Sequence, residues 1–313
     1  MSIVRAMIKP SCATDLNRQL FTVTVEHKEK GFLSLGPHGF HRIAYTQWGN
    51  GHSKRVVVCV HGLTRSGRDF DALATELSAD EDAGYRIACP DLAGRGHSHW
   101  LSDPADYQLP VYMSDMTAMI ARLGVEQVDW VGTSLGGLIG MSLAAQPNSP
   151  IRSLVMNDVG PLVPSSALQR IGDYVGHKEK FADYASLKNY LMNVHASFGD
   201  LTDEQWEHLC THSGRKNEDG SWSLHYDPSI ALNFRAAAAV DIDLWPLWEQ
   251  ITCPVLVLRG EDSDLLTRDV AHQMLERGPA AELIEFPGCG HAPALMDKDQ
   301  IRAISSWLKA LNS

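Results

Sequence analysis

Short runs of aliphatic and β-branched residues alternate with stretches of helical spacing along most of this sequence, and this alternation constrains the fold more than any other feature. The run from Val56 to Val60 is apolar throughout, which is typical of a strand covered on both faces. Further predicted strands cover residues 31–35, 42–46, 85–91, 128–132, 151–157, 254–260 and 281–286, and predicted helices cover residues 70–79, 113–123, 135–145, 269–277 and 298–311. We therefore expect an α/β fold with a mostly parallel, doubly wound sheet.

The interval from residue 161 to residue 245 breaks this alternation. It contains amphipathic stretches at 182–194 and 202–210 but no convincing buried strand. We expect a helical cap here, inserted into an α/β core that comprises residues 31–160 and 246–313. Residues 1–30 are an N-terminal extension to which the pattern assigns no structure.

The composition limits the partners of the chain. Its 38 acidic and 27 basic residues give a formal net charge of −11, which repels phosphate backbones and anionic membrane surfaces. No apolar run approaches the roughly 18 residues that span a bilayer, no signal peptide is recognisable, and the six cysteines contain no Cys-x-x-Cys pair. We expect a cytoplasmic monomer or homodimer with reduced thiols that acts on a small molecule and binds neither nucleic acid nor membranes.

A Gly-x-Ser-x-Gly pattern runs from Gly132 to Gly136 and has Ser134 at its centre. The bare pattern arises often by chance, but here it joins a predicted strand to a predicted helix. Such a turn holds the serine in a strained conformation with an exposed hydroxyl, and the flanking glycines permit the tight approach of the backbone. Ser134 is the candidate nucleophile, and a plain small-residue turn is the structural alternative.

The sequence His61-Gly62-Leu63-Thr64 follows the apolar strand at 56–60. A chain that leaves a strand through His-Gly can bring its next backbone N–H near a bound carbonyl. We predict that the N–H groups of Leu63 and Leu135 form an oxyanion hole, in which each donor contributes roughly 3 kcal/mol to transition-state stabilisation. His61 is then structural.

The candidate general base is His291, which lies between the last predicted strand and the last predicted helix. The glycines at positions 288 and 290 leave this loop free to bring the imidazole toward Ser134. A general base must come within about 3 Å of the hydroxyl that it deprotonates.

Two strands end in a carboxylate that can orient this histidine. The first choice for the acid is Asp264, on the loop after strand 254–260. The alternative is Asp158, at the end of strand 151–157, and Asp262 ranks third. Each of them has a structural alternative as a turn-capping residue.

Taken together, these motifs resemble the α/β-hydrolase-fold enzymes that carry a helical cap, over about residues 31–311. The resemblance rests on His61-Gly62, Asp91 to Ser98, Gly132 to Gly136, Arg259 to Asp264 and Gly290-His291, which occur in the order of that family. It implies a serine hydrolase with a Ser–Asp–His triad and no metal or organic cofactor. The family usually has its acid where this sequence has Ser263, and some relatives take it from the earlier strand.

The nucleophile narrows the activity within that family. Relatives that hydrolyse epoxides or haloalkanes have aspartate where this chain has Ser134, whereas serine predicts an acyl-enzyme. We predict a carboxylesterase. An amidase, a thioesterase and a C–C bond hydrolase are alternatives within the fold, and a catalytically silent ligand-binding protein is the alternative of another class.

Two histidine pairs have the spacing of metal ligands, His208-x-x-x-His212 and His97-x-His99. Neither has a recognisable third ligand in the sequence. We therefore expect no metal site.

Overall fold

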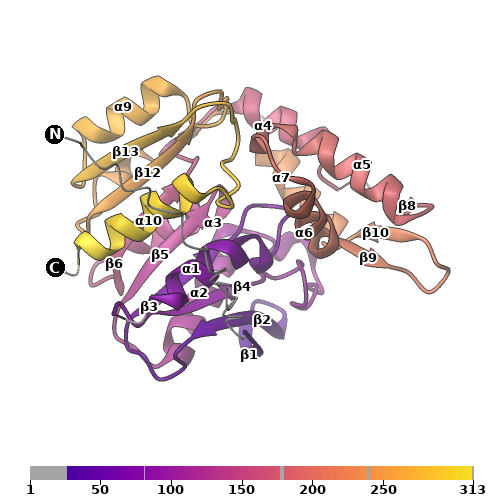
Figure 1. Cartoon of the computed structure of the whole chain (residues 1–313), viewed down its shortest axis with the longest axis horizontal. Coiled ribbons are helices and arrows are strands. Elements are labelled where there is room, and N and C mark those ends of the chain that lie inside the picture. The colour runs from indigo at the N-terminus through magenta and orange to yellow at the C-terminus, as the bar shows by residue number, and fades with distance from the viewer. Residues whose placement is uncertain (1–26, 81, 177–179, 238–239, 312–313) are drawn as a thin grey trace, which may run out of the picture.

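The computed structural model describes residues 27–80, 82–176, 180–237 and 240–311. Its centre is an eight-stranded sheet with the order β1-β2-β4-β3-β5-β6-β12-β13 (Figure 1). The strands are β1 (Lys28–Gly36), β2 (Gly39–Gly49), β3 (Val56–Val60), β4 (Arg86–Pro90), β5 (Val128–Thr133), β6 (Ile151–Asn157), β12 (Val255–Gly260) and β13 (Ala281–Phe286). From β4 to β13 neighbouring strands are parallel, and β1 and β2 pair antiparallel at one edge. The predicted α/β fold is confirmed.

Helices cover both faces of this sheet. They are α1 (Asp71–Ala79), α2 (Leu109–Leu123), α3 (Leu135–Ala144), α9 (Arg268–Glu276) and α10 (Lys298–Ala310). Along β3, Val56, Val58 and Val60 pack with α2 and α3, whereas Val57 and Cys59 pack with α1 and α10. This double burial explains why the strand is apolar at every position.

Several boundaries differ from the sequence prediction, most of them by one or two residues, whereas β2 extends the predicted strand 42–46 by three residues at each end. β1 begins at Lys28, three residues before the expected start of the core, and residues 1–26 of the expected extension lie outside the described part of the chain. α2 begins at Leu109 rather than at residue 113, because Pro110 occupies its first turn. Proline is well tolerated there, since the first N–H groups of a helix have no acceptor within it.

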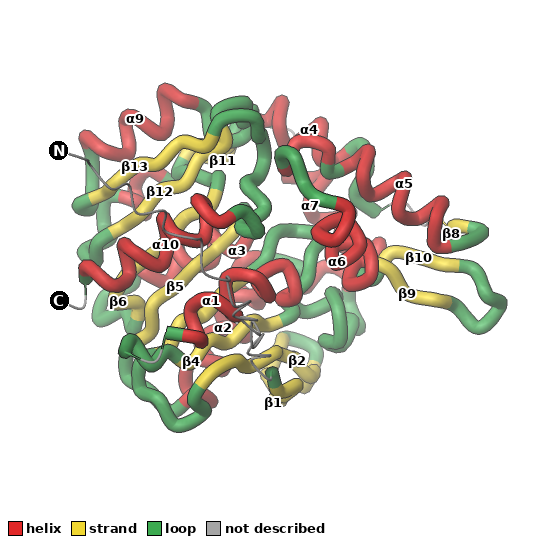
Figure 2. Tube along the Cα trace, in the orientation of Figure 1, coloured by secondary structure: helices red, strands yellow, loops and turns green. Residues whose placement is uncertain are grey.

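The described residues of the segment 161–245, which we call the insertion, add no strand to the eight-stranded sheet (Figure 2). Its helices are α4 (Ser165–Gly172), α5 (Tyr184–Val194), α6 (Asp203–Ser213), α7 (Ala231–Ala237) and, from Trp245 on, α8 (Trp245–Trp248). Contrary to the expectation of helices alone, it also forms two small antiparallel sheets from β7 (Leu162–Val163), β8 (Lys180–Phe181), β9 (Gly214–Lys216), β10 (Trp222–Leu224) and β11 (Ile242–Asp243). These strands are too short to show a period in the sequence.

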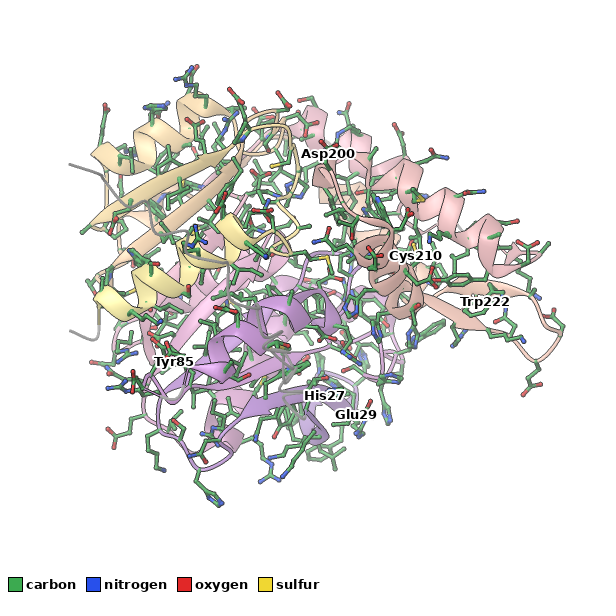
Figure 3. All side chains as sticks on the ribbon, viewed as in Figure 1. His27, Glu29, Tyr85, Asp200, Cys210 and Trp222 are labelled. Carbon is green, nitrogen blue, oxygen red and sulfur yellow. The ribbon has the colours of Figure 1, made fainter. Side chains whose placement is uncertain are left out.

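The insertion supplies most of a separate hydrophobic cluster, to which the core adds Met296. Leu187 and Leu191 of α5 pack there with Trp206 and Leu209 of α6 and with Phe181. Figure 3 shows the side chains around the labelled Cys210 and Trp222 in this part of the molecule. None of the described helices is long and apolar enough to cross a membrane.

Parallel pairing brings the carboxyl ends of three strands together. Asn157, the last residue of β6, is in register with Thr133 of β5 and with Leu258 of β12. The residues that follow these strands therefore meet at one edge of the sheet, which is where open α/β sheets bind ligands.

Candidate active site

Ser134 occupies the sharp turn between β5 and α3. Its backbone has φ 52° and ψ −115°, a sparsely populated conformation for a residue with a side chain. A Cβ on Gly136 would lie 1.9 Å from the Val60 carbonyl oxygen, and one on Gly132 would lie 2.3 Å from the Gly136 carbonyl oxygen. Both glycines are thus required by close backbone contacts.

Three side chains form a hydrogen-bonded row at this turn. The Nε2 atom of His291 lies 3.0 Å from the Oγ atom of Ser134, and its Nδ1 atom lies 2.8 Å from the Oδ2 atom of Asp158. The side chain of Asp158 is completely buried, and that of His291 is 11% exposed. This is the geometry in which a carboxylate orients an imidazole and the imidazole takes a proton from a hydroxyl.

Of the acid candidates, the structure brings Asp158 to His291 and pairs the first choice, Asp264, with Arg170 instead. The carboxylate of Asp264 accepts hydrogen bonds from Nε and Nη2 of Arg170 on α4, at 2.6 and 2.7 Å. Burial disfavours its charged form, but Arg170 outweighs this effect and lowers the pKa of Asp264. Asp262 is exposed. The sequence placed both carboxylates at strand ends but contained no distance to choose between them.

Ser263 also contacts Asp158, and no role was predicted for it from the sequence. Its hydroxyl oxygen accepts hydrogen bonds from the N–H groups of Leu265 and Leu266, at 3.3 and 3.1 Å. It lies 2.6 Å from Oδ2 of Asp158, and its single proton is therefore donated to that carboxylate. The N–H of Gly260 donates to the other oxygen, at 2.8 Å. The signal that pointed here was serine at the position where the family usually has its acid.

A cavity of about 540 Å³ opens beside Ser134. Its described lining contains no charged residue and combines core and insertion: Leu63, Tyr107, Gln108, Leu109, Tyr112, Ser134, Leu135, Leu138, Val159, Val163, Leu168, Ile171, Ile230, Asn233, Phe234, Ile242, Leu244 and Leu265. Another cavity, of about 590 Å³, lies at the amino ends of β3 and β5 and contains none of the predicted site residues. The cavity beside Ser134 is therefore the candidate substrate site.

The model of the alpha/beta hydrolase family matches residues 57–304, which include this whole constellation. The chain belongs to the alpha/beta hydrolase family. It is 49% identical over 280 residues to a 3-hydroxybutyrate-oligomer hydrolase from Cupriavidus necator, a match that covers 87% of this chain and 94% of that protein. The prediction of a hydrolase enzyme is thereby confirmed.

Two solved structures have the same fold as this alpha/beta hydrolase. A putative hydrolase from Rickettsia typhi superimposes with a TM-score of 0.84 and is 32% identical, covering 91% of this chain and 99% of the other. An alpha/beta hydrolase from Novosphingobium aromaticivorans gives a TM-score of 0.81 at 36% identity, with the same coverage of both chains. The fold is thus shared over nearly the full length of these relatives.

In this alpha/beta hydrolase, His61 holds the turn that leads to Leu63. Its Nε2 atom accepts the N–H of Leu92 at 2.9 Å, and its Nδ1 atom lies 2.7 Å from the Gly62 carbonyl oxygen. Burial lowers the pKa of His61 to about 3, so the ring is neutral and Nδ1 carries the proton. Leu63 then lines the cavity together with Ser134 and Leu135. Leu135 is the first residue of α3, and the N–H groups of a first helical turn have no acceptor within the helix.

The insertion also holds the loop of this hydrolase that carries His291. The hydroxyl of Ser197 donates to the carbonyl of His291, and the N–H of Gly290 donates to the carbonyl of Ser197, both at 2.7 Å. No pattern in the sequence singles out Ser197, because the contact depends on how the insertion folds back over the sheet edge.

Proposed function

We propose that this protein is a serine carboxylesterase that hydrolyses short hydroxyacyl esters through an acyl-enzyme intermediate. The row Ser134–His291–Asp158, with contacts of 3.0 and 2.8 Å, is the observation that carries the proposal. In this assignment Asp158 is the acid, and the insertion is a cap over the cavity.

In the first half-reaction, the Oγ atom of Ser134 attacks the ester carbonyl and its proton moves to Nε2 of His291. The carboxylate of Asp158 stabilises the resulting imidazolium through Nδ1. The N–H groups of Leu63 and Leu135 hold the oxyanion. The tetrahedral intermediate then collapses, and His291 returns the proton to the alcohol that leaves.

In the second half-reaction, water replaces the alcohol. His291 takes a proton from the water, and the hydroxide attacks the acyl carbon. When this intermediate collapses, Ser134 Oγ leaves and regains its proton from His291, and the carboxylic acid is released. The reaction consumes one water per ester bond and requires no cofactor.

The lining of the cavity supports a neutral acyl group. None of its described residues offers a positive charge to a carboxylate. The acyl part of the substrate is therefore the part that has no carboxylate. The similarity to a 3-hydroxybutyrate-oligomer hydrolase supports the same class, because such oligomers have a hydroxyl at one end and a carboxylate at the other. We propose that the hydroxyl end enters the cavity and that the carboxylate stays on the leaving side.

The test compares hydrolysis of 3-hydroxybutyrate dimer and trimer, 4-nitrophenyl butyrate and the matched anilide by wild type and Ser134→Ala. We expect the esters to be cleaved, the anilide to resist and Ser134→Ala to lose roughly 10⁴-fold or more in kcat. The control is Ser142→Ala on the same helix, because the buried hydroxyl of Ser142 has no hydrogen-bond partner among the described residues. Faster cleavage of the anilide would point to an amidase instead.

A fluorophosphonate probe separates an enzyme from a silent binding protein of the same fold. We expect one probe per chain on Ser134, detected by intact mass, and none on the Ser134→Ala variant. Failure of wild type to react would overturn the assignment of the nucleophile.

A further inference from the structure

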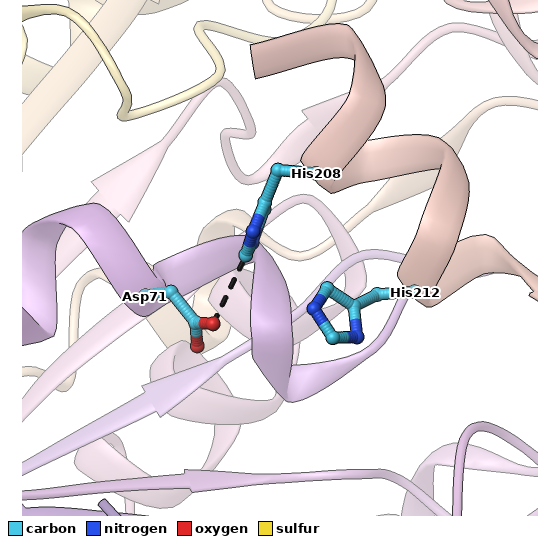
Figure 4. A group of neighbouring side chains, drawn as sticks. All are labelled: Asp71, His208 and His212. Carbon is cyan, nitrogen blue, oxygen red and sulfur yellow. Dashed lines mark ion pairs between the residues drawn. The ribbon is translucent and has the colours of Figure 1, made fainter. Parts of the chain in front are cut away.

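His208 and His212 lie one turn apart on α6 of the insertion, and the fold supplies the third group that the sequence lacked. Figure 4 shows Asp71, the first residue of α1, opposite these two rings. One ligand atom from each residue lies within 4.8 Å of the other two. The two imidazole rings are 4.7 Å apart between centroids.

We propose that Asp71, His208 and His212 bind a divalent transition-metal ion of the Zn²⁺ class. Two imidazoles and one carboxylate are a donor set that such ions prefer, whereas Mg²⁺ and Ca²⁺ favour oxygen ligands. Three protein ligands leave the fourth position of a tetrahedral ion to water. The site is separate from the Ser134–His291–Asp158 row and does not depend on the proposed reaction.

The three donors are held in place by the fold but remain within reach of solvent. His208 and His212 are half-buried, and Asp71 is mostly buried at the start of α1. The Nε2 atom of His208 lies 3.6 Å from Oδ2 of Asp71. The His208 and Asp71 side chains are 27% and 11% exposed, so an ion can reach them without unfolding of the segment.

Arg68 would compete with a metal ion for the carboxylate of Asp71. Its Nε atom lies 2.9 and 2.8 Å from the two carboxylate oxygens of Asp71, and its carbonyl oxygen is 2.9 Å from Nε2 of His208. An ion must therefore displace part of this pairing and draw His208 off the carbonyl. Loss of the Arg68 side chain should consequently strengthen metal binding, whereas loss of any ligand should weaken it.

A bound ion would connect the insertion to the sheet domain, since α6 belongs to the first and α1 to the second. The C-terminal end of α6 already contacts this part of the core, because Arg65 donates to the hydroxyl of Ser213 at 2.8 Å. Because the ion binds only the folded arrangement of both elements, it should raise the temperature of thermal unfolding.

The experiment uses untagged full-length protein, dialysed against EDTA and titrated with ZnCl₂ by calorimetry. We expect one ion per chain, with binding weakened about tenfold or more in His208→Gln, His212→Gln and Asp71→Asn, and tightened in Arg68→Gln. The control is His272→Gln, since His272 is exposed on α9, away from this cluster. Retained circular dichroism and esterase activity would show that each variant is folded.

Co²⁺ provides a second readout that a purely structural role of these residues would not produce. We expect visible d–d absorption on titration of wild type and its loss in His212→Gln. No binding by wild type, undiminished binding in the double variant His208→Gln/His212→Gln, or an equal loss in His272→Gln would each overturn the proposal.

Discussion

The loops that follow β6 and β12 begin alike and end differently. Each places a carboxylate just beyond the carboxyl end of a buried parallel strand, yet Asp158 is completely buried against His291, whereas Asp264 is 48% exposed and paired with Arg170. The β12 loop contributes Ser263 instead, which donates to Asp158 at 2.6 Å. One loop thus supplies the charge next to the histidine, and the other supplies a hydrogen bond that holds it.

Removing each carboxylate in turn tests most directly which of the two loops supplies the acid. We expect Asp158→Asn to lower kcat by about a thousandfold to ten-thousandfold, because an amide does not hold the required tautomer of His291 or stabilise its imidazolium. Asp264→Asn should keep kcat within a few-fold of wild type. Steady-state kinetics on one ester measure both variants, and equal losses would show that neither loop supplies the acid.

Moving the carboxylate from the β6 loop to the β12 loop tests whether an acid on the second loop can serve His291. In an Asp158→Asn background, Ser263→Asp places an acid on the β12 loop, where the serine oxygen lies 2.6 Å from the Asp158 carboxylate. We expect it to restore kcat about tenfold or more over Asp158→Asn alone. The matched control is Ser263→Asn in the same background, which should restore nothing. Equal rates in the two double variants would show that the β12 loop does not reach His291.

The strand and the serine turn of this site could be predicted from the sequence, whereas the choice of the acid required distances between side chains. The strand at 56–60 and the turn at Ser134 were predictable because double burial and close backbone contact restrict the residue types. The choice between Asp158 and Asp264 was not, since both satisfy the same pattern and only the register of β6 against β12 and the position of Arg170 separate them. Ser197 left no signal, because its partner lies 94 positions away in the chain.

Removing the hydroxyl of Ser263 tests how much the β12 loop contributes to catalysis while the acid stays on the β6 loop. Ser263→Ala removes one hydrogen bond to a buried carboxylate, and such bonds contribute about 1.5 to 3 kcal/mol. We expect kcat to fall by about tenfold, with the pH–rate profile shifted, and Ser263→Thr to recover most of it. A loss of stability with unchanged kcat and pH profile would indicate a structural role alone.

The pairing of Asp264 with Arg170 should have the smallest effect, on stability rather than on catalysis. Because both side chains are more than two-fifths exposed, solvent screens the pair, and Arg170→Gln should lower the free energy of unfolding at pH 7 by no more than about 1 kcal/mol. Arg170 lowers the pKa of Asp264 in the folded state from its ordinary value of 3.8, against the opposing effect of burial. The contribution is therefore present above the unfolded-state pKa and is lost as the pH falls through the folded-state value. Urea unfolding of wild type and Arg170→Gln should differ at pH 7 and converge below pH 3.8, and a difference that grows in acid would assign Arg170 a role apart from this carboxylate.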